Sequence, residues 1–156
     1  MPKLDRLPEV NRNALLTFPA PVNDGAPCSP LAKPLSACRV ALVTTAGLHM
    51  RGDVAFVSGD QSYRVIPSAT PGGEILQSHS SIGFDHVPFQ RDMNVTFPVD
   101  RLRELADRGT IGSLATNFYS FMGAQRGWDR IQSETAPAVA KALLADGVDA
   151  VFLTPT

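Results

Sequence analysis

The sequence of 156 residues lacks long apolar runs and an excess of charge of either sign. No apolar run approaches the roughly 18 residues that a membrane-spanning helix needs, so no membrane segment is predicted. The formal net charge is -1, and no basic stripe is present to neutralise phosphates, which argues against a nucleic-acid partner. The first residues, MPKLDRLPEVNRNALL, carry charges and proline where a signal peptide needs unbroken apolar sequence, which predicts a cytoplasmic protein.

Cysteines are few and nucleotide-binding motifs are absent. Cys28 and Cys38 are spaced in a way that matches neither a zinc site nor a CxxC motif. Cys28 lies in a polar, proline-rich stretch and Cys38 leads into an apolar run, which predicts one exposed and one packed thiol rather than a disulfide framework. Neither GxGxxG nor GxxxxGKS/T occurs, so no nucleotide and no other cofactor is expected within this chain.

Proline dominates the N-terminal stretch, with seven prolines in residues 1–37. Because proline fixes φ and removes a backbone donor, this stretch is expected to form neither a long helix nor a central strand. Residues 1–38 are therefore predicted to be an irregular arm with one short helical turn near residues 8–16. Residues 39–156 are predicted to belong to one α/β domain, since the length of the chain suits a single core.

Strands and helices alternate in the pattern after residue 38. Apolar, β-branched runs at residues 39–48 and 148–153 are typical of strands buried on both faces. Helices are predicted at residues 99–109, between a proline and a glycine stop, and at residues 133–146. Short links predict a mainly parallel sheet with flanking helices in Rossmann-like layers. Further extended segments are expected at residues 54–57 and 63–66 around a turn at 58–60, at 93–97 and at 111–115.

Polar residues near the carboxyl edge of this sheet are the first candidates for a ligand site, because open parallel sheets bind ligands there. Thr44 and Thr45 end the first strand before a glycine, so substrate contact through a small anion nest is one interpretation. His49 follows the same turn and is a catalytic candidate, with a bond to a loop carbonyl as the alternative. Asp60 and Arg64 either hold an anion or form a structural ion pair, and the ion pair is favoured.

Histidines and carboxylates gather between residues 79 and 92. His79, Asp85 and Asp92 could bind a metal or move protons, but their spacing fits neither HExxH nor a facial triad. No metal site is therefore predicted. Asp92 and Asn94 are candidates for substrate contact, and the alternative is that they organise a loop through Asx-type bonds.

Six blocks match a known pattern when they are taken in order: residues 41–49 (ALVTTAGLH), 59–67 (GDQSYRVIP), 78–85 (SHSSIGFD), 91–105 (RDMNVTFPVDRLREL), 109–123 (GTIGSLATNFYSFMG) and 135–156 (TAPAVAKALLADGVDAVFLTPT). They resemble the selenoprotein subunit of glycine, sarcosine and betaine reductases, and still more the D-proline reductase branch. The resemblance covers about residues 39–156. It implies an oxidoreductase subunit that reductively cleaves a C–N bond of a small amino acid or amine.

Roles for particular residues follow from this resemblance. It implies acid–base or orienting roles for His79 and Asp85, and substrate contact by Thr154 and Thr156 at the end of the last strand. In that family a strand like this one is followed at once by selenocysteine or cysteine, so the reactive residue is expected just after Thr156. A partner subunit with a pyruvoyl group would hold the substrate amine, and a thiol reductant system would restore the reduced enzyme.

The final strand is expected to lack part of its cover, since no helix follows residue 156. This predicts an α/β reductase domain truncated at a selenocysteine codon, inactive alone and prone to aggregation. The alternative is a non-catalytic binding or scaffolding module without the nucleophile, and the nucleotide sequence after codon 156 separates the two. A thiol enzyme that uses Cys28 or Cys38 is a weaker alternative, because neither cysteine ends a strand or begins a helix.

Overall fold

The computed structural model describes residues 3–17, 25, 29–81 and 83–155, and its central feature is a five-stranded sheet. Strand β1 (Arg39–Thr44) pairs in parallel along its length with β7 (Ala150–Thr154). On its other side β1 pairs in parallel with β5 (Ser113–Leu114) near its start and with β6 (Asn117–Phe121) near its end. Strand β3 (Tyr63–Pro67) pairs antiparallel with β6. The other three pairings are parallel, so the sheet is mainly parallel.

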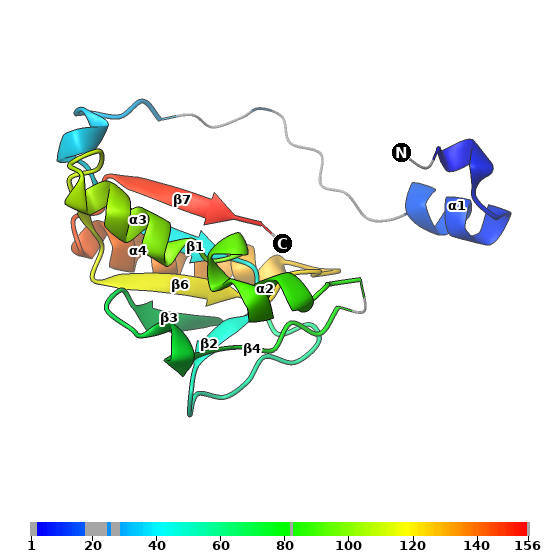
Figure 1. The fold of residues 1–156 in the computed structure, drawn as a ribbon. Helices are drawn as coiled ribbons and strands as arrows, with labels where there is room; N and C mark the ends of the chain where they lie inside the picture. The colour runs from blue at the N-terminus through cyan, green and yellow to red at the C-terminus, as the bar shows by residue number, and fades with distance from the viewer. Residues whose placement is uncertain (1–2, 18–24, 26–28, 82, 156) are drawn as a thin grey trace.

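A small antiparallel pair and several helices complete the described part of the fold (Figure 1). Strand β2 (Leu48–Met50) pairs with β4 (Ile75–Gln77). Helix α3 lies in front of the sheet and α4 behind it in Figure 1. The helices are α1 (Glu9–Leu16), α2 (Val87–Arg91), α3 (Val99–Asp107) and α4 (Ala136–Ala145), and the shorter turns are η1 (Leu4–Arg6), η2 (Leu35–Ala37), η3 (Gly72–Glu74), η4 (Met93–Val95) and the π-helical η5 (Ile131–Thr135). No helix in the described ranges is long and apolar enough to cross a membrane.

Strand β1 lies in the middle of the core. Ala41 and Leu42 point to opposite faces of the sheet, and both are fully buried. The rings of Phe97 and Phe118 meet edge to face with centroids 5.9 Å apart, and both side chains are fully buried. Burial on both faces explains why β1 reads as a continuous apolar run in the sequence.

The amino edge of the sheet is closed by polar contacts. Arg39 Nη2 lies 2.8 Å from Asp146 Oδ1, and the Thr116 backbone N–H donates to Asp146 Oδ2 at 2.6 Å. Burial raises the pKa of Asp146, but the hydrogen bonds from Thr116 and Arg39 outweigh it and leave the pKa below its ordinary value. Lys33 pairs with Asp149 at 2.8 Å beside them. The charges at this edge therefore join the strands to the end of α4.

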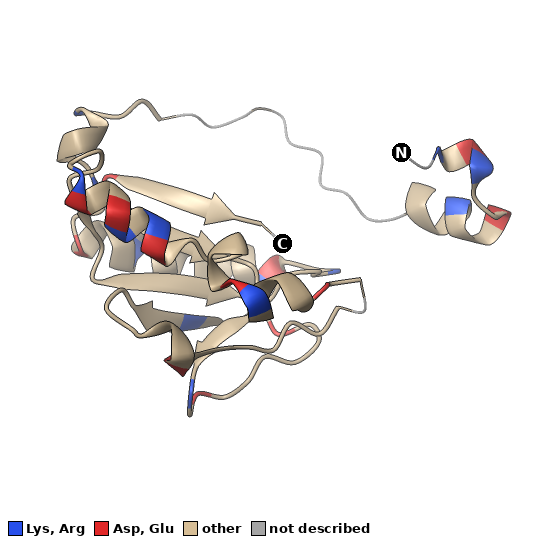
Figure 2. Ribbon diagram, viewed as in Figure 1, with Lys and Arg blue, Asp and Glu red and all other residues tan. Residues whose placement is uncertain are grey.

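Strand β7 forms an apolar edge of the sheet. It pairs with β1, and no described residue pairs with its outer side. Val151, Phe152 and Leu153 are between 41% and 66% exposed, and Figure 2 shows no charged residue along β7. A groove of about 380 Å³, lined by Leu102, Leu105 and Phe152 among others, separates β7 from α3. Edge strands are usually protected by charge or a bulge, and β7 carries no charged residue.

Most of the predicted elements are confirmed, although their ends shift. The α/β class, the mainly parallel sheet, β1, β7, α3 and α4 are as expected, while Rossmann-like layering stays a prediction. The prediction of a strand at residues 93–97 was wrong, because Asp92 caps the η4 turn by accepting the Asn94 backbone N–H at 2.9 Å. Residues 54–57 form no strand, and β6, which the sequence pattern does not predict, lies in the sheet.

The described part of the N-terminal arm contains α1, which confirms the short helix expected near residues 8–16. All residues of α1 are exposed. Cys38 is fully buried, as expected, with its Sγ 3.4 Å from the Pro34 carbonyl oxygen. Cys28 lies outside the described residues, and the division of the chain at residue 38 stays a prediction.

Candidate functional site

The carboxyl ends of β1 and β7 bring three predicted site residues together. Thr44 Oγ1 donates to the Thr154 carbonyl oxygen at 3.2 Å, and the Thr45 backbone N–H donates to the same oxygen at 3.2 Å. Thr44 is 1% exposed. Thr156, the fourth threonine predicted at this edge, lies outside the described residues. Parallel pairing therefore places Thr44, Thr45 and Thr154 at one edge, where loops can add a ligand site.

Two buried hydroxyls at this edge have no hydrogen-bond partner among the described residues, and they belong to Thr96 and Thr154. Thr44 lies between these two residues, because its Oγ1 is 3.2 Å from the Thr154 carbonyl oxygen and 3.4 Å from the Thr96 carbonyl oxygen. An unpaired buried hydroxyl costs about 1–3 kcal/mol, so such groups mark places where a further polar group can bind. Sequence reasoning did not single out Thr96, because it follows η4 in a stretch without clean periodicity.

His79 lies against the turn that follows β1. Gly47 has a φ of +65°, and a Cβ at this position would lie 3.1 Å from the backbone N and Cα of His79. The Ser78 backbone N–H donates to the Gly47 carbonyl oxygen at 2.9 Å. The glycine therefore allows the segment with His79 to approach the end of β1, where Thr44 and Thr45 lie.

The imidazole of His79 is held as a neutral donor. Its Nδ1 accepts the Ser81 backbone N–H at 3.3 Å, so Nε2 carries the proton in the neutral ring. Nε2 is buried and has no partner among the described residues. Phe84 stacks on the ring at 4.2 Å between centroids. Burial lowers the pKa of His79, and the positive charge of His86 lowers it further.

His79 is expected to titrate below the ordinary histidine pKa of about 6.5. The NMR signal of its ring Cε1–H, followed against pH, measures this pKa, and His86→Ala should raise it by removing the repulsion. Between the lowered pKa and about 6.5 the unfolded chain binds a proton that the folded chain does not. The free energy of unfolding should therefore rise with pH through this interval. Titration of His79 at or above 6.5 would contradict this account of its burial.

Beside His79, three loops enclose a pocket of about 390 Å³ at the carboxyl end of β6. One loop lies between β2 and β3, one follows β4, and one follows β6. Only Arg126 among the lining residues is charged. The lining residues are Ser58, Gly59, Ser80, Ser81, Met122, Ala124 and Arg126. Sequence reasoning missed Arg126 and the three serines, because no local spacing links positions so far apart in the chain.

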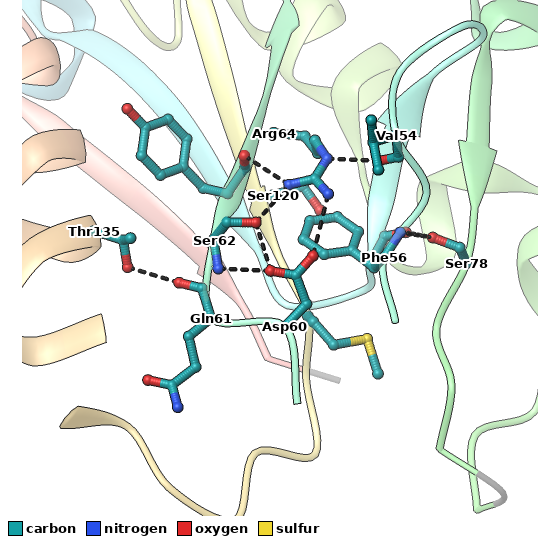
Figure 3. A network of polar contacts seen from close by, with 12 residues as sticks. Val54, Phe56, Asp60, Gln61, Ser62, Arg64, Ser78, Ser120 and Thr135 are labelled. Atoms are coloured by element: carbon teal, nitrogen blue, oxygen red, sulfur yellow. Dashed lines mark hydrogen bonds and ion pairs between the residues drawn. The ribbon is translucent and has the colours of Figure 1, made fainter. Parts of the chain in front are cut away.

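A polar network holds the first of these loops against β3 (Figure 3). Arg64 Nη2 lies 3.2 Å from Asp60 Oδ2, and the guanidinium stands 4.2 Å from the centre of the Phe56 ring. The predicted ion pair between Asp60 and Arg64 is therefore confirmed. Burial raises the pKa of Asp60, but hydrogen bonds from Ser62 and Arg64 outweigh it and lower the pKa overall.

Two further contacts join the walls of the pocket. Ser78 Oγ accepts the Phe56 backbone N–H at 2.8 Å, which fixes the loop after β4 to the loop after β2. Gln125 Nε2 donates to the Asp60 carbonyl oxygen at 2.7 Å and to the Met122 carbonyl oxygen at 3.1 Å. All three loops are therefore connected to one another by hydrogen bonds.

Other predicted site residues make local contacts. His49 lies on β2, is 6% exposed, and its Nδ1 is 3.0 Å from the Met50 carbonyl oxygen. Asp85 is exposed and accepts the Val87 backbone N–H at 2.9 Å. Asp92 makes the Asx-type bond to Asn94 described above, which is the contact that the alternative interpretation expects. Catalytic or substrate-binding roles for these four residues stay predictions.

No group of three or more His, Cys, Asp and Glu side chains within the described ranges could hold a metal ion. What the carboxyl edge offers is neutral hydroxyl and imidazole donors beside one arginine. Such groups can orient a small polar substrate and stabilise negative charge.

The mainly parallel sheet and the pocket beside its carboxyl edge define an α/β domain with a cavity built from loops. The model of the family described as glycine/sarcosine/betaine reductase selenoprotein B matches residues 11–156. This chain belongs to the glycine/sarcosine/betaine reductase selenoprotein B family, in agreement with the resemblance of its six sequence blocks.

Individual relatives support this assignment. The chain is 41% identical over 127 residues to D-proline reductase subunit gamma of Acetoanaerobium sticklandii, a match that covers 81% of this chain and 52% of that protein. It is 32% identical to sarcosine reductase complex component B subunit beta of Peptoclostridium acidaminophilum, covering 89% of this chain and 33% of that protein. It is 31% identical to glycine reductase complex component B subunit gamma of Carboxydothermus hydrogenoformans, covering 92% and 34%. The chain thus spans about half the length of the first relative and a third of the others, and no solved structure matches it.

Proposed function

We propose that this chain is a subunit of a selenol- or thiol-dependent reductase that cleaves a C–N bond of an amino acid or amine. D-proline is the first candidate substrate, and glycine, sarcosine and betaine are the others. The observation that carries the proposal is the 41% identity to a D-proline reductase subunit, because it extends over most of the chain. The neutral donors gathered at the carboxyl edge are compatible with this chemistry.

The threonine hydroxyls suit an anionic nucleophile. In this proposal a selenocysteine or cysteine follows Thr156, close to the end of β7, and supplies the nucleophile that breaks the C–N bond. The unpartnered hydroxyls of Thr96 and Thr154 could donate hydrogen bonds to such an anion, which would lower its pKa and favour the reactive form. The Nε2–H of His79 could orient the substrate or return a proton to the departing nitrogen.

Partner chains are part of the proposal. The exposed apolar face of β7 and the groove beside α3 are suited to further polypeptide, and the relatives are named as subunits or components of complexes. We propose that a partner subunit carries a pyruvoyl group that holds the substrate amine. A thiol reductant system would then reduce the oxidised nucleophile. We propose that the assembly works in the cytoplasm.

The test is turnover by the full-length protein. The gene would be expressed through any in-frame TGA after codon 156, together with the reductase partner subunits encoded beside it, and dithiothreitol would supply electrons. We expect D-proline to be converted to 5-aminovalerate, with glycine, sarcosine and betaine assayed in parallel for loss of the amine. An assembled complex that turns over none of the four substrates would overturn the proposal and favour a non-catalytic binding role.

A further inference from the structure

Arg126 brings a positive charge to the pocket at the end of β6 without an acidic partner. No described residue forms a hydrogen bond or ion pair with Arg126, and no carboxylate is among the described residues that line the pocket. The nearby carboxylate of Asp60 is already paired with Arg64. Arg126 is exposed and shares the pocket lining with serines rather than acids, so it can accept an anionic ligand without first breaking an ion pair.

The serines supply hydrogen-bond donors of the right kind. Ser81 Oγ accepts the Gly83 backbone N–H at 3.3 Å, which leaves the Ser81 hydroxyl proton free to donate to a ligand. Ser58 and Ser80 bring two more hydroxyls from different loops. Hydroxyl and guanidinium donors together match the oxygens of a small anion.

The backbone of the pocket contains strain. Ala124 has a φ of +53° and is the one non-glycine residue with positive φ in the described ranges. Such conformations are unfavourable and persist where the surrounding contacts hold them, often at ligand sites. Here Gln125, the next residue, anchors the loop to Met122 and to Asp60. The loop is therefore held in the conformation that presents Arg126 to the pocket.

We propose that this pocket is a carboxylate-binding site, in which Arg126 and the hydroxyls of Ser58, Ser80 and Ser81 hold the carboxylate of the amino-acid substrate. The identity of the ligand rests on the proposed function, whereas the preference for a carboxylate rests on the pocket. Arg126 is the only positive charge among the described lining residues, so it balances a carboxylate with its single negative charge. A phosphate dianion would need a second positive charge. The volume of about 390 Å³ admits a small amino acid.

The position of the pocket agrees with the rest of the site. Met122 in its lining bridges to Ala46, two residues beyond the end of β1. Only β1 separates β6 from β7, so these two strands lie about 10 Å apart in the sheet, and the pocket follows the carboxyl end of β6. A substrate that is held by its carboxylate at Arg126 can extend along the carboxyl edge toward the threonines.

The test compares Arg126→Gln with Arg108→Gln in the full-length protein within its reductase complex. Arg108 is an exposed arginine at the end of α3, and it too has no ion pair among the described residues, so it controls for loss of charge. Arg126→Gln should raise KM for D-proline about tenfold or more while kcat changes less than about twofold. Arg126→Lys should restore part of the loss, and Arg108→Gln should leave KM unchanged.

Binding of D-proline and D-prolinamide is measured separately by titration calorimetry of the same complexes. D-prolinamide has no carboxylate, so its Kd should be insensitive to Arg126→Gln, whereas the Kd of D-proline should rise. Inorganic phosphate should compete only weakly, and tighter binding of phosphate than of D-proline would overturn the assignment. An active wild-type complex whose KM and Kd do not respond to Arg126→Gln would overturn this proposal alone. An inactive complex that binds D-proline through Arg126 would overturn the proposed function alone.

Discussion

Phe118→Ala is expected to lower the free energy of unfolding by about 3–5 kcal/mol, which is a large part of the 5–15 kcal/mol typical of a domain. Phe118 lies on β6 and is fully buried. Its ring packs edge to face on Phe97, with centroids 5.9 Å apart, on the side of the sheet that η4 and α3 cover. Alanine would remove this contact and leave a cavity, which the closely packed strands and helix around it cannot fill by small movements.

Urea denaturation followed by circular dichroism measures this loss. The matched control is Phe89→Ala, because Phe89 is only partly buried where it packs against the core from α2. The control should cost clearly less than Phe118→Ala. A loss below about 1 kcal/mol for Phe118→Ala would contradict the full burial of the Phe118 side chain in the core.

Phe118 also shows where prediction from sequence succeeds and where it fails. Strands β1 and β7 are predictable because strands of a parallel sheet read as unbroken apolar runs. Strand β6 escapes the same reasoning, since its sequence NFYSF interrupts the apolar pattern with Ser120. Ser120 is nevertheless fully buried, because its Oγ accepts the Leu48 backbone N–H at 2.7 Å and so satisfies its polarity inside the core.

A tertiary contact explains the wrong prediction at residues 93–97. The segment MNVTF has the β-branched and aromatic residues of a strand. The side chain of Asn94 instead joins two elements: it donates to Asp92, and its Oδ1 accepts the Asp100 backbone N–H at 3.0 Å. These bonds hold a tight turn directly before α3, and local propensity alone cannot reveal them.

Some residues of the candidate site could likewise be predicted from the sequence, and others could not. Thr44, Thr45 and Thr154 were predictable, because residues at the carboxyl ends of parallel strands must meet. Arg126 and its serine neighbours come from three loops, and their convergence depends on how those loops fold over the sheet. The roles predicted for His49 and Asp85 rested on position and on family resemblance, neither of which fixes what a side chain contacts.

Gly47→Ala is the second substitution for which we expect a large effect, and it tests the connection between the fold and His79. Alanine at a φ of +65° costs about 1–2 kcal/mol in strain. The new Cβ would also lie 3.1 Å from the backbone of His79, which is held by the bond between Ser78 N–H and the Gly47 carbonyl oxygen. Backbone cannot rotate away as a flexible side chain can, so the segment with His79 should move and the loss of stability should exceed the strain alone.

Gly109→Ala separates these two contributions. Gly109 has a φ of +70°, and a Cβ there would have no heavy atom within 4 Å, so the substitution carries the strain without the contact. Thermal unfolding should therefore show a smaller loss for Gly109→Ala than for Gly47→Ala. Only Gly47→Ala should shift the NMR signals of the His79 ring and, under the proposed function, raise KM for D-proline. Equal losses of stability with an unmoved His79 signal would mean that the end of β1 does not position this histidine. The threonines at the end of β1 and the pocket that contains Arg126 would then be two separate features rather than one site.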